Sequence, residues 1–301
     1  NFRSIKILIS LLIVIGFQSA HSQLIIQNNL TPEQLVQQIL VGSGVTVLNV
    51  TYTGAVNARG SFINGSSTNL GIDEGVILSS GGIFSAPGNV SVFANTNNGQ
   101  PGDPQLTNLA GNTTHDAAVL EFDFIPQSDT LTFKYVFGSE EYPEYVCSGF
   151  NDVFGFFVSG PNPASPLNPY DNMNIALIPE SFPPLPVAIN TVNRGSPGGS
   201  YPASGCVSLA YSHLYIDNQL MGGTTIVYDG FTRTLIATLV VEPCEQYHIK
   251  LAVGDAGDYA YDSSVFLEAN SFSSPGMSTS VSFSNSSNFF GSAVEACNDA
   301  I

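Results

Sequence analysis

Residues 118–137 hold two consecutive segments in which apolar and polar side chains alternate, and this pattern constrains the fold more than any other. In residues 118–124 every second residue is Ala, Leu or Phe, and in residues 131–137 every second residue is Leu, Phe or Tyr. A period of two places successive side chains on opposite faces of a β-strand. With turn residues at 126–129 between them, the two segments predict an antiparallel hairpin with one apolar face.

Further segments of the chain also have the composition of β-strands. Residues 45–53 and 75–79 are rich in β-branched or apolar residues. Residues 152–158 are apolar on both faces in part, which is typical of a central strand. Additional strands are expected near 174–178 and at 232–242, 246–253 and 264–272.

One helix is predicted, close to the start of the folded chain. Thr31 can cap it, Pro32 suits the first helical position, and Gln34 completes a capping box. Apolar residues then recur at helical spacing up to Leu40, and Gly42 ends the run.

The remaining segments are loops by composition. Residues 86–109 are rich in Gly, Asn and Pro, and most of 159–205 has the same character. Many strands, one helix and long connections predict an all-β fold. We expect a β-sandwich of jelly-roll type with long loops and one short N-terminal helix.

The chain is acidic, although few of its residues are charged. It has 7 Lys and Arg against 24 Asp and Glu, a net charge of −17, while 43% of its 301 residues are hydrophobic. The hydrophobic content argues against disorder. The charge argues against nucleic acid and anionic membrane as partners, because both require Lys or Arg to neutralise phosphate. Metal cations suit this charge better.

Residues 1–22 have the features of a secretory signal peptide. Arg3 and Lys6 precede an apolar run at 7–16, and Ala20 and Ser22 provide small residues for cleavage. The apolar run is shorter than the roughly 20 residues of a membrane span, although an uncleaved anchor stays open as the alternative. We expect a secreted protein whose mature domain does not enter the membrane.

The rest of the chain divides by composition into a domain, a linker and a second start. Residues 23–272 contain all the predicted strands described above. Residues 273–281 are rich in Ser, Gly and Pro and predict a linker. Residues 282–301 are expected to be the truncated start of a second β-module.

Secretion permits disulfides, and the chain has four cysteines: Cys147, Cys206, Cys244 and Cys297. Their spacing lacks the close pairs of a zinc site. Cys297 lies beyond the predicted linker, so the main domain is expected to contain at most one internal bridge. Which two of its three cysteines pair stays open, as does the possibility of free thiols.

Two loops concentrate carboxylates. The first contains Glu140, Glu141 and Asp152, and the second contains Asp255, Asp258 and Asp262 beside a Gly-containing turn. Closely spaced carboxylates repel one another unless a positive charge lies among them, and this chain has few basic residues. Calcium takes six to eight oxygen ligands in loose geometry. The hypothesis is that both loops meet at one end of the sandwich and share a calcium ion.

Other interpretations of these acids compete with the calcium site. The aspartates could instead cap turns through their own backbone. A glycoside hydrolase needs two carboxyl groups placed across a sugar, and nothing in the spacing enforces that. A calcium-dependent carbohydrate-binding module would need an aromatic platform. The chain has no Trp, so Tyr142, Tyr145, Tyr259 and Tyr261 would have to supply it.

Several separated motifs resemble one known family. They are FKYVFGSEEYPEYVCSGFNDVFGFFVSGP, YDGFTRTL and PCEQYHIKLAVGDAGDYAYDSSVFLEANSF, with LTPEQLVQQILVGSGVTVLNVTYTG and GIDEGVILSSG before them. In this order they are similar to the choice-of-anchor L domain, over about residues 30–272. The resemblance implies a bacterial protein that is secreted and attached to the cell surface.

The sequence therefore predicts a non-enzymatic extracellular domain of a larger bacterial surface protein. It is expected to act in adhesion or as a structural spacer, stabilised by calcium and by a disulfide. Its expected partner is a cell-surface or matrix component, with a glycan as the alternative ligand. A rigid sandwich with long loops suits binding, because loops vary without disturbing the core.

Overall fold

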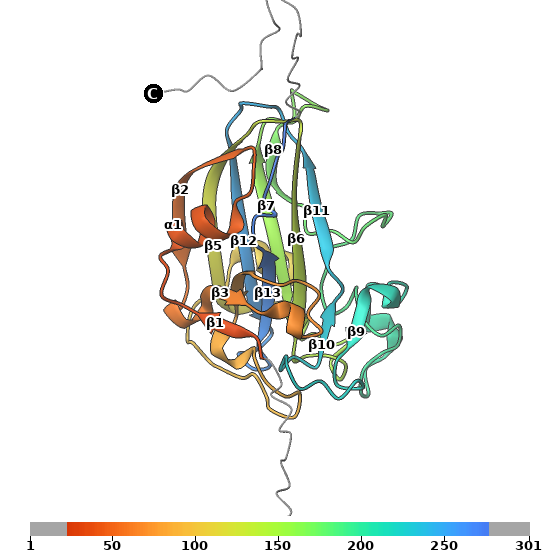
Figure 1. Cartoon of the computed structure of the whole chain (residues 1–301). Helices are drawn as coiled ribbons and strands as arrows, with labels where there is room; N and C mark the ends of the chain where they lie inside the picture. Colours follow the sequence, from red (N-terminus) through yellow and green to blue (C-terminus); the bar gives the residue numbers. More distant parts are fainter. Residues whose placement is uncertain (1–22, 277–301) are drawn as a thin grey trace, which may run out of the picture.

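The computed structural model describes residues 23–276 and shows two antiparallel β-sheets packed face to face (Figure 1). The predicted all-β sandwich is confirmed. The larger sheet has the order β1 (Ile25–Gln27), β3 (Arg59–Ile63), β4 (Gly75–Ser79), β13 (Ser263–Glu268), β6 (Thr130–Ser139), β10 (Gly230–Thr232) and β9 (Tyr215–Asp217), with β11 (Leu235–Val240) also paired to β6. The smaller sheet has the order β2 (Val45–Thr53), β5 (Thr114–Pro126), β12 (Tyr247–Ala256), β7 (Val153–Gly160) and β8 (Tyr170–Asn174).

The predicted N-terminal helix is present, with the expected cap. It begins as α1 (Pro32–Gln34), where Thr31 and Gln34 form a reciprocal capping box. It continues as a wider π-helical turn, Leu35–Leu40, in which the Val41 amide donates to the Val36 carbonyl. Single 3₁₀ turns occur at Val56–Ala58, Gly65–Ser67, Ile83–Ser85, Ala203–Gly205 and Ser212–Leu214.

A second helix was missed by the prediction of a continuous loop over 86–109. Helix α2 (Pro104–Ala110) begins after Asp103, whose Oδ1 accepts hydrogen bonds from the Gln105 and Leu106 amides. Gly111 ends it with a φ of 74°. The helix has only 7 residues, which is too short for a helical period to stand out. The cap and the proline after it were the available signals.

The predicted hairpin over 118–137 is wrong. Strand β5 pairs with β2 and β12 in the smaller sheet, whereas β6 pairs with β13, β10 and β11 in the larger one. The connection between them therefore crosses from one sheet to the other. Their apolar faces meet across the core instead of lying side by side in one sheet. The prediction failed because alternation specifies which face of a strand is buried but not which strand is its neighbour.

The remaining strand predictions vary in accuracy. Strands β2 and β4 have the predicted bounds, and β7 lies inside its sheet as expected. Strand β8 lies before the predicted 174–178, and the predicted 232–242 is divided between the end of β10 and β11. The short strands β1, β3 and β9 were not anticipated. The jelly-roll connectivity stays a prediction.

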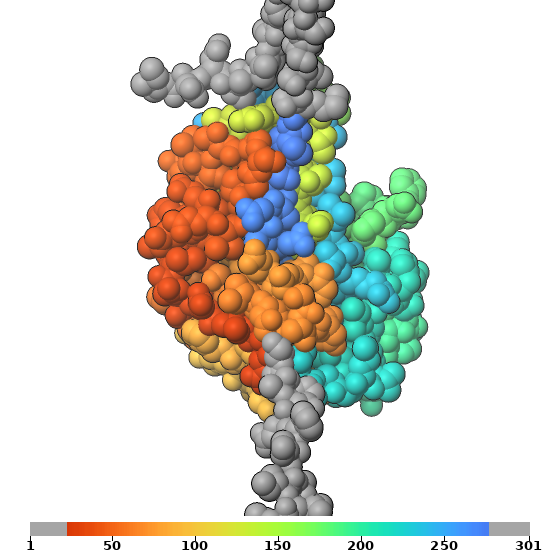
Figure 2. Space-filling model, viewed as in Figure 1, coloured from red at the N-terminus to blue at the C-terminus, as the bar shows by residue number. Residues whose placement is uncertain are grey.

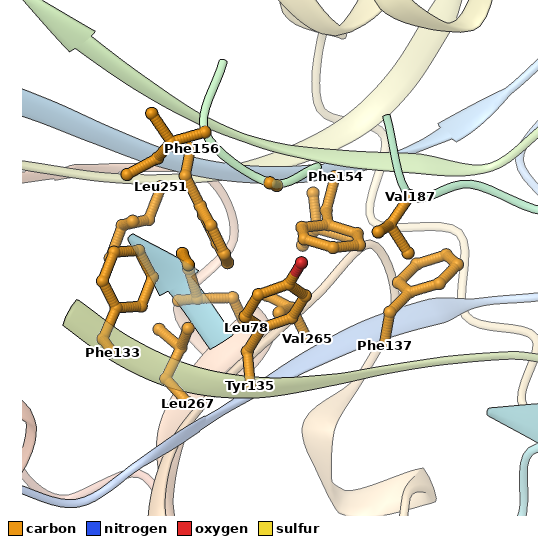
Figure 3. Close-up of a cluster of buried hydrophobic side chains, with 14 of the residues drawn as sticks. Leu78, Phe133, Tyr135, Phe137, Phe154, Phe156, Val187, Leu251, Val265 and Leu267 are labelled. Carbon is orange, nitrogen blue, oxygen red and sulfur yellow. The ribbon is translucent and has the colours of Figure 1, made fainter. Parts of the chain in front are cut away.

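The core between the sheets is dominated by aromatic side chains in contact with one another (Figure 3). The centre of the Phe156 ring lies 4.8 Å from that of Phe133 and 4.9 Å from that of Tyr135, and Phe154 extends the cluster. Offset and edge-on aromatic packing of this kind adds to the free energy gained by burying the rings. These rings come from β6 and β7, the two strands that flank the first acidic loop.

Two smaller apolar clusters cover the outer faces of the sheets. Helix α2 packs Leu106 over Val119 and Phe157 on the smaller sheet. On the other side, Phe62, Tyr228 and Phe266 pack on the larger sheet. In the space-filling view, the segments around β3 and β4 (orange) and around β9 (teal) cover the lower part of the molecule (Figure 2). The predicted signal peptide and the predicted second β-module lie outside the described residues.

Candidate functional site

The two acidic loops meet at one end of the sandwich, the lower end in Figure 1. Residues 140–152 connect β6 to β7, and residues 257–262 connect β12 to β13, so each loop crosses between the sheets. The Glu140 amide donates to the Asp262 carbonyl over 3.2 Å. The Ala256 amide donates to Asp152 Oδ1 over 2.8 Å. The chain thus places residues separated by more than 100 positions in one structural unit.

Five of the six predicted ligands are buried together, and we call them the acidic cluster. Each is at most 2% exposed. None of the ion pairs in residues 23–276 includes a member of it. Buried carboxylates without a positive partner carry a large desolvation penalty. The members are Glu140, Glu141, Asp152, Asp255 and Asp262.

Burial raises the pKa of every member of the acidic cluster. Desolvation is the main cause, and repulsion between neighbouring carboxylates adds to it. The pKa rises to about 8 for Glu140 and Asp152, to about 11 for Glu141 and to about 6 for Asp262. The pKa of Asp255 lies well above its usual range. Without a cation, the cluster therefore retains protons at neutral pH.

Three members of the cluster hold neighbouring segments through hydrogen bonds. Oε1 of Glu140 accepts from the Ala94 amide over 3.1 Å. Asp152 Oδ2 accepts from the Ser263 hydroxyl over 2.7 Å, in addition to the Ala256 amide. The Asp262 carboxylate accepts from the Thr96 amide at 2.9 and 3.0 Å. A Cβ atom at Gly81 would overlap this carboxylate, so a larger residue there would have to displace Asp262 from the Thr96 amide.

Other carboxylate oxygens in the cluster have no hydrogen-bond partner. Both oxygens of Asp255 are buried and unpartnered, as are Oε2 of Glu140 and Oε2 of Glu141. The Ser80 hydroxyl lies close enough to oppose the rise in the pKa of Asp255, but that hydroxyl donates its hydrogen bond to the Ser263 carbonyl. Asp255 is buried because it continues the core-facing series of β12, two residues after Val253.

Asp258, the sixth predicted ligand, has a different environment. It is half-buried, and its Oδ1 accepts from the Ala260 amide over 2.9 Å. This is the turn-capping arrangement that the sequence left open as the alternative.

Two further acids and a third loop, around Thr96, belong to this end of the sandwich and were not predicted from the sequence. Asp116 is 1% exposed, and its carboxylate accepts from the Asn98 and Gln100 amides. It lies where β5 has one residue more than β12, with a φ of 48°. Such a bulge redirects a side chain, and no pattern in the sequence predicts it. Asp229 is 4% exposed, and burial raises its pKa to about 7.

The carboxylates lie close together without forming a finished coordination sphere. In the part of the chain that the structure describes, no three His, Cys, Asp or Glu side chains converge tightly enough to hold a metal ion as they stand.

The burial of the carboxylates also limits the access of a sugar that would be hydrolysed. Glu140, Glu141 and Asp152 are covered by the surrounding loops, so a sugar cannot reach two of them at once.

Aromatic side chains form a rim around the acidic cluster. Tyr145 lies 5.3 Å from Tyr261, and Phe93 lies 6.1 Å from Tyr261. Tyr259 is 38% exposed and Phe93 is 66% exposed. Tyr142 does not belong to this rim. It is fully buried and its hydroxyl donates to the Val192 carbonyl, which corrects its assignment as a sugar-stacking residue.

A disulfide holds the first acidic loop. Cys147 in this loop is bonded to Cys206, 59 residues later. The bridge ties the loop to the long connection that follows β8. By linking two positions 59 residues apart, it lowers the conformational entropy of the unfolded chain and so stabilises the folded state. None of the three described cysteines is a free thiol. Cys297 lies outside the described residues.

Comparison with protein families matches residues 24–273 to the choice-of-anchor L domain. No curated protein and no solved structure gave a match. No helix within residues 23–276 is long and apolar enough to cross a membrane. The match spans most of the 301-residue chain and the whole sandwich with its acidic loops. The chain therefore belongs to the choice-of-anchor L family, whose domains are those of surface-anchored bacterial proteins.

Proposed function

We propose that this chain is a non-catalytic domain of a bacterial surface protein that acts in adhesion or as a structural spacer, and that its acidic cluster binds calcium. The observation that supports the calcium site most strongly is Asp255, which is 1% exposed with two unpartnered carboxylate oxygens. A buried carboxylate with no donor needs a proton or a cation. Outside the cell, calcium is an abundant cation suited to carboxylate oxygens.

Calcium would act by joining three loops. The free oxygens of Asp255, Glu140 and Glu141 belong to the ends of β12 and β6. The neighbouring loop around Thr96 is already bonded to Asp262. Calcium tolerates irregular geometry and accepts backbone carbonyls as ligands, so small side-chain movements would complete the site. Magnesium demands a regular octahedron and suits this loop arrangement less well.

Titration of the EDTA-stripped protein with calcium tests this proposal. At calcium concentrations 100 times Kd, binding adds about 2.7 kcal/mol to the free energy of unfolding, which raises Tm by roughly 5–10 °C. Calorimetry should show a saturable heat. In Asp255→Asn the affinity is expected to fall at least about tenfold, because one charged ligand is lost.

Asp171→Asn is the matched control. It removes the same charge from an exposed residue of β8, at the opposite end of the sandwich. This variant should bind calcium as the wild type does. Absence of both heat and Tm change in the stripped wild type would contradict the calcium site, and equal losses in both variants would contradict its location.

The aromatic rim supports a second candidate function, a calcium-dependent carbohydrate-binding module. Phe93, Tyr145, Tyr259 and Tyr261 gather beside the acidic cluster, and aromatic faces are good surfaces for apolar contact with a ligand. In this candidate the bound calcium would fix the loops that carry the rim.

A glycan array probed with and without calcium separates this candidate from a spacer. Carbohydrate binding predicts glycan signals that disappear with EDTA and in Tyr261→Ala. They should persist in Phe182→Ala, which removes an aromatic ring that is 97% exposed in another loop. A spacer predicts no calcium-dependent signal on any glycan.

A further inference from the structure

Lys250 forms the least exposed ion pair in residues 23–276, on the outer face of the smaller sheet. Its Nζ contacts Oδ2 of Asp103, and the two side chains are 13% and 11% exposed. Nζ also contacts Oε1 of Gln105 at 2.6 Å. The other ion pairs of this part of the chain are surface pairs that involve Lys134 or His248, each with one side chain more than 40% exposed.

A second acid and an aromatic ring flank this pair. Lys250 on β12 lies directly opposite Glu121 on β5 and Phe157 on β7. Directly opposite residues share one face, with Cβ atoms about 4.5–5.5 Å apart. Nζ lies 5.8 Å from the centre of the Phe157 ring. Glu121, Asp103 and Lys250 line one cavity of about 130 Å³.

We propose that Lys250 and Asp103 become joined by an intramolecular isopeptide bond, with Glu121 as the proton carrier. A buried Lys–Asp pair can neutralise itself by proton transfer, because neither charge is well solvated. Helix α2 and the sheet hold the two groups in contact. Fixed geometry of this kind gives effective molarities of about 10⁵–10⁸ M in intramolecular reactions.

The reaction is a condensation that needs no oxidant or cofactor. One proton passes from the Lys250 ammonium to Oδ2 of Asp103 along their contact, which leaves a neutral amine and a protonated carboxyl group. The Nζ lone pair then attacks Cγ of Asp103 to form the Nζ–Cγ bond. Glu121 accepts a second proton from Nζ and delivers it to the Oδ2 hydroxyl. The Cγ–Oδ2 bond breaks and Oδ2 leaves as water. One ammonium and one carboxylate become one amide and one water.

The hydrogen bonds around the pair fit the product. Oδ1 of Asp103 would remain as the amide oxygen and keep the Gln105 and Leu106 amides that start α2. The single remaining Nζ–H would donate to Oε1 of Gln105. Asp103 is itself fixed by its amide, which donates to the Thr114 hydroxyl over 3.1 Å.

The bond would link a loop to a central strand of the smaller sheet. Asp103 and Lys250 are 147 residues apart in sequence. A covalent link there would keep α2 on the sheet when the domain is pulled or heated. This inference is independent of calcium, because the pair lies outside the acidic cluster.

Mass spectrometry of the reduced full chain tests the bond. The wild type is expected to be lighter than its sequence mass by one water. Trypsin should fail to cut after Lys250 and should release a branched peptide containing Asp103 and Lys250. A sequence mass with normal cleavage after Lys250 would overturn the proposal and leave an ordinary ion pair. Loss of water mapped to another residue would overturn it as well.

Variants test the separate roles of Lys250, Asp103 and Glu121 in forming the bond. Lys250→Arg and Asp103→Ala are expected to have their full masses. Lys134→Arg, a change in a surface ion pair, should keep the water deficit. Glu121→Gln should form the branched peptide more slowly after refolding, and an unchanged rate would overturn the role of Glu121. The decisive measurement uses the wild type, so it does not depend on whether a variant folds.

Discussion

In EDTA, the free energy of unfolding of this domain is expected to fall by about 3 kcal/mol or more between pH 5 and pH 8. The reason is the acidic cluster, whose pKa values rise on folding from 3.8–4.5 to about 8 for Glu140 and Asp152 and about 11 for Glu141. Between these values the folded state holds more protons than the unfolded state. Stability then decreases with pH, by about 1.4 kcal/mol per pH unit for each retained proton.

Calcium should abolish most of this decrease. The ion replaces the protons, so the carboxylates can ionise in the folded state, and calcium affinity should itself rise with pH. Denaturant unfolding at pH 5, 6.5 and 8, with EDTA and with calcium, measures both effects. Asp255→Asn should show a shallower fall in EDTA and a smaller response to calcium. Equal stability of the metal-free wild type at pH 5 and pH 8 would show that the cluster does not titrate as its burial requires.

Phe156→Ala is expected to lower the free energy of unfolding by about 3–5 kcal/mol. Phe156 is fully buried at the centre of the core, where its ring packs against Phe133, Tyr135 and Phe154 (Figure 3). Its removal leaves a cavity between the two sheets that the surrounding rings cannot fill without leaving their rotamers. Urea unfolding monitored by circular dichroism measures the change.

Phe182→Ala is the control for this prediction, since it deletes the same atoms from a side chain that is 97% exposed. It should change the stability by less than about 0.5 kcal/mol. A Phe156→Ala domain with wild-type stability would mean that the aromatic cluster between the sheets is not the main core.

The strands of the core could be predicted from the sequence because burial on one face leaves a period of two. Strands β2 and β4 have their predicted bounds, and the apolar series in β5 and β6 line the core as expected. Whether β5 and β6 form a hairpin could not be decided from this alternation. A neighbour in the same sheet and a partner across the core both satisfy the same alternation. The second arrangement forms because β5 pairs with β2 and β12, while β6 pairs with β13.

The candidate site could be predicted only in part. Clustering along the chain identified the two loops that meet, because carboxylates at strand ends stand out in an apolar sequence. Asp116 and the loop around Thr96 were missed, since they join the site through a β-bulge and backbone hydrogen bonds. The same bonds show that Asp262 holds a loop, while Asp255 keeps both oxygens free. Sequence alone gave the six acids equal weight.

The sequence by itself determined the class of fold, the buried faces of the main strands and the family, because apolar periodicity and ordered motifs are properties of the chain. Only the tertiary structure decided which strands are neighbours, which acids are buried and which of them lack a partner. Those properties depend on contacts between residues such as Asp152 and Ala256, which are 104 positions apart. The energy of a carboxylate depends on its surroundings, so its role is settled only once the two sheets have closed over it.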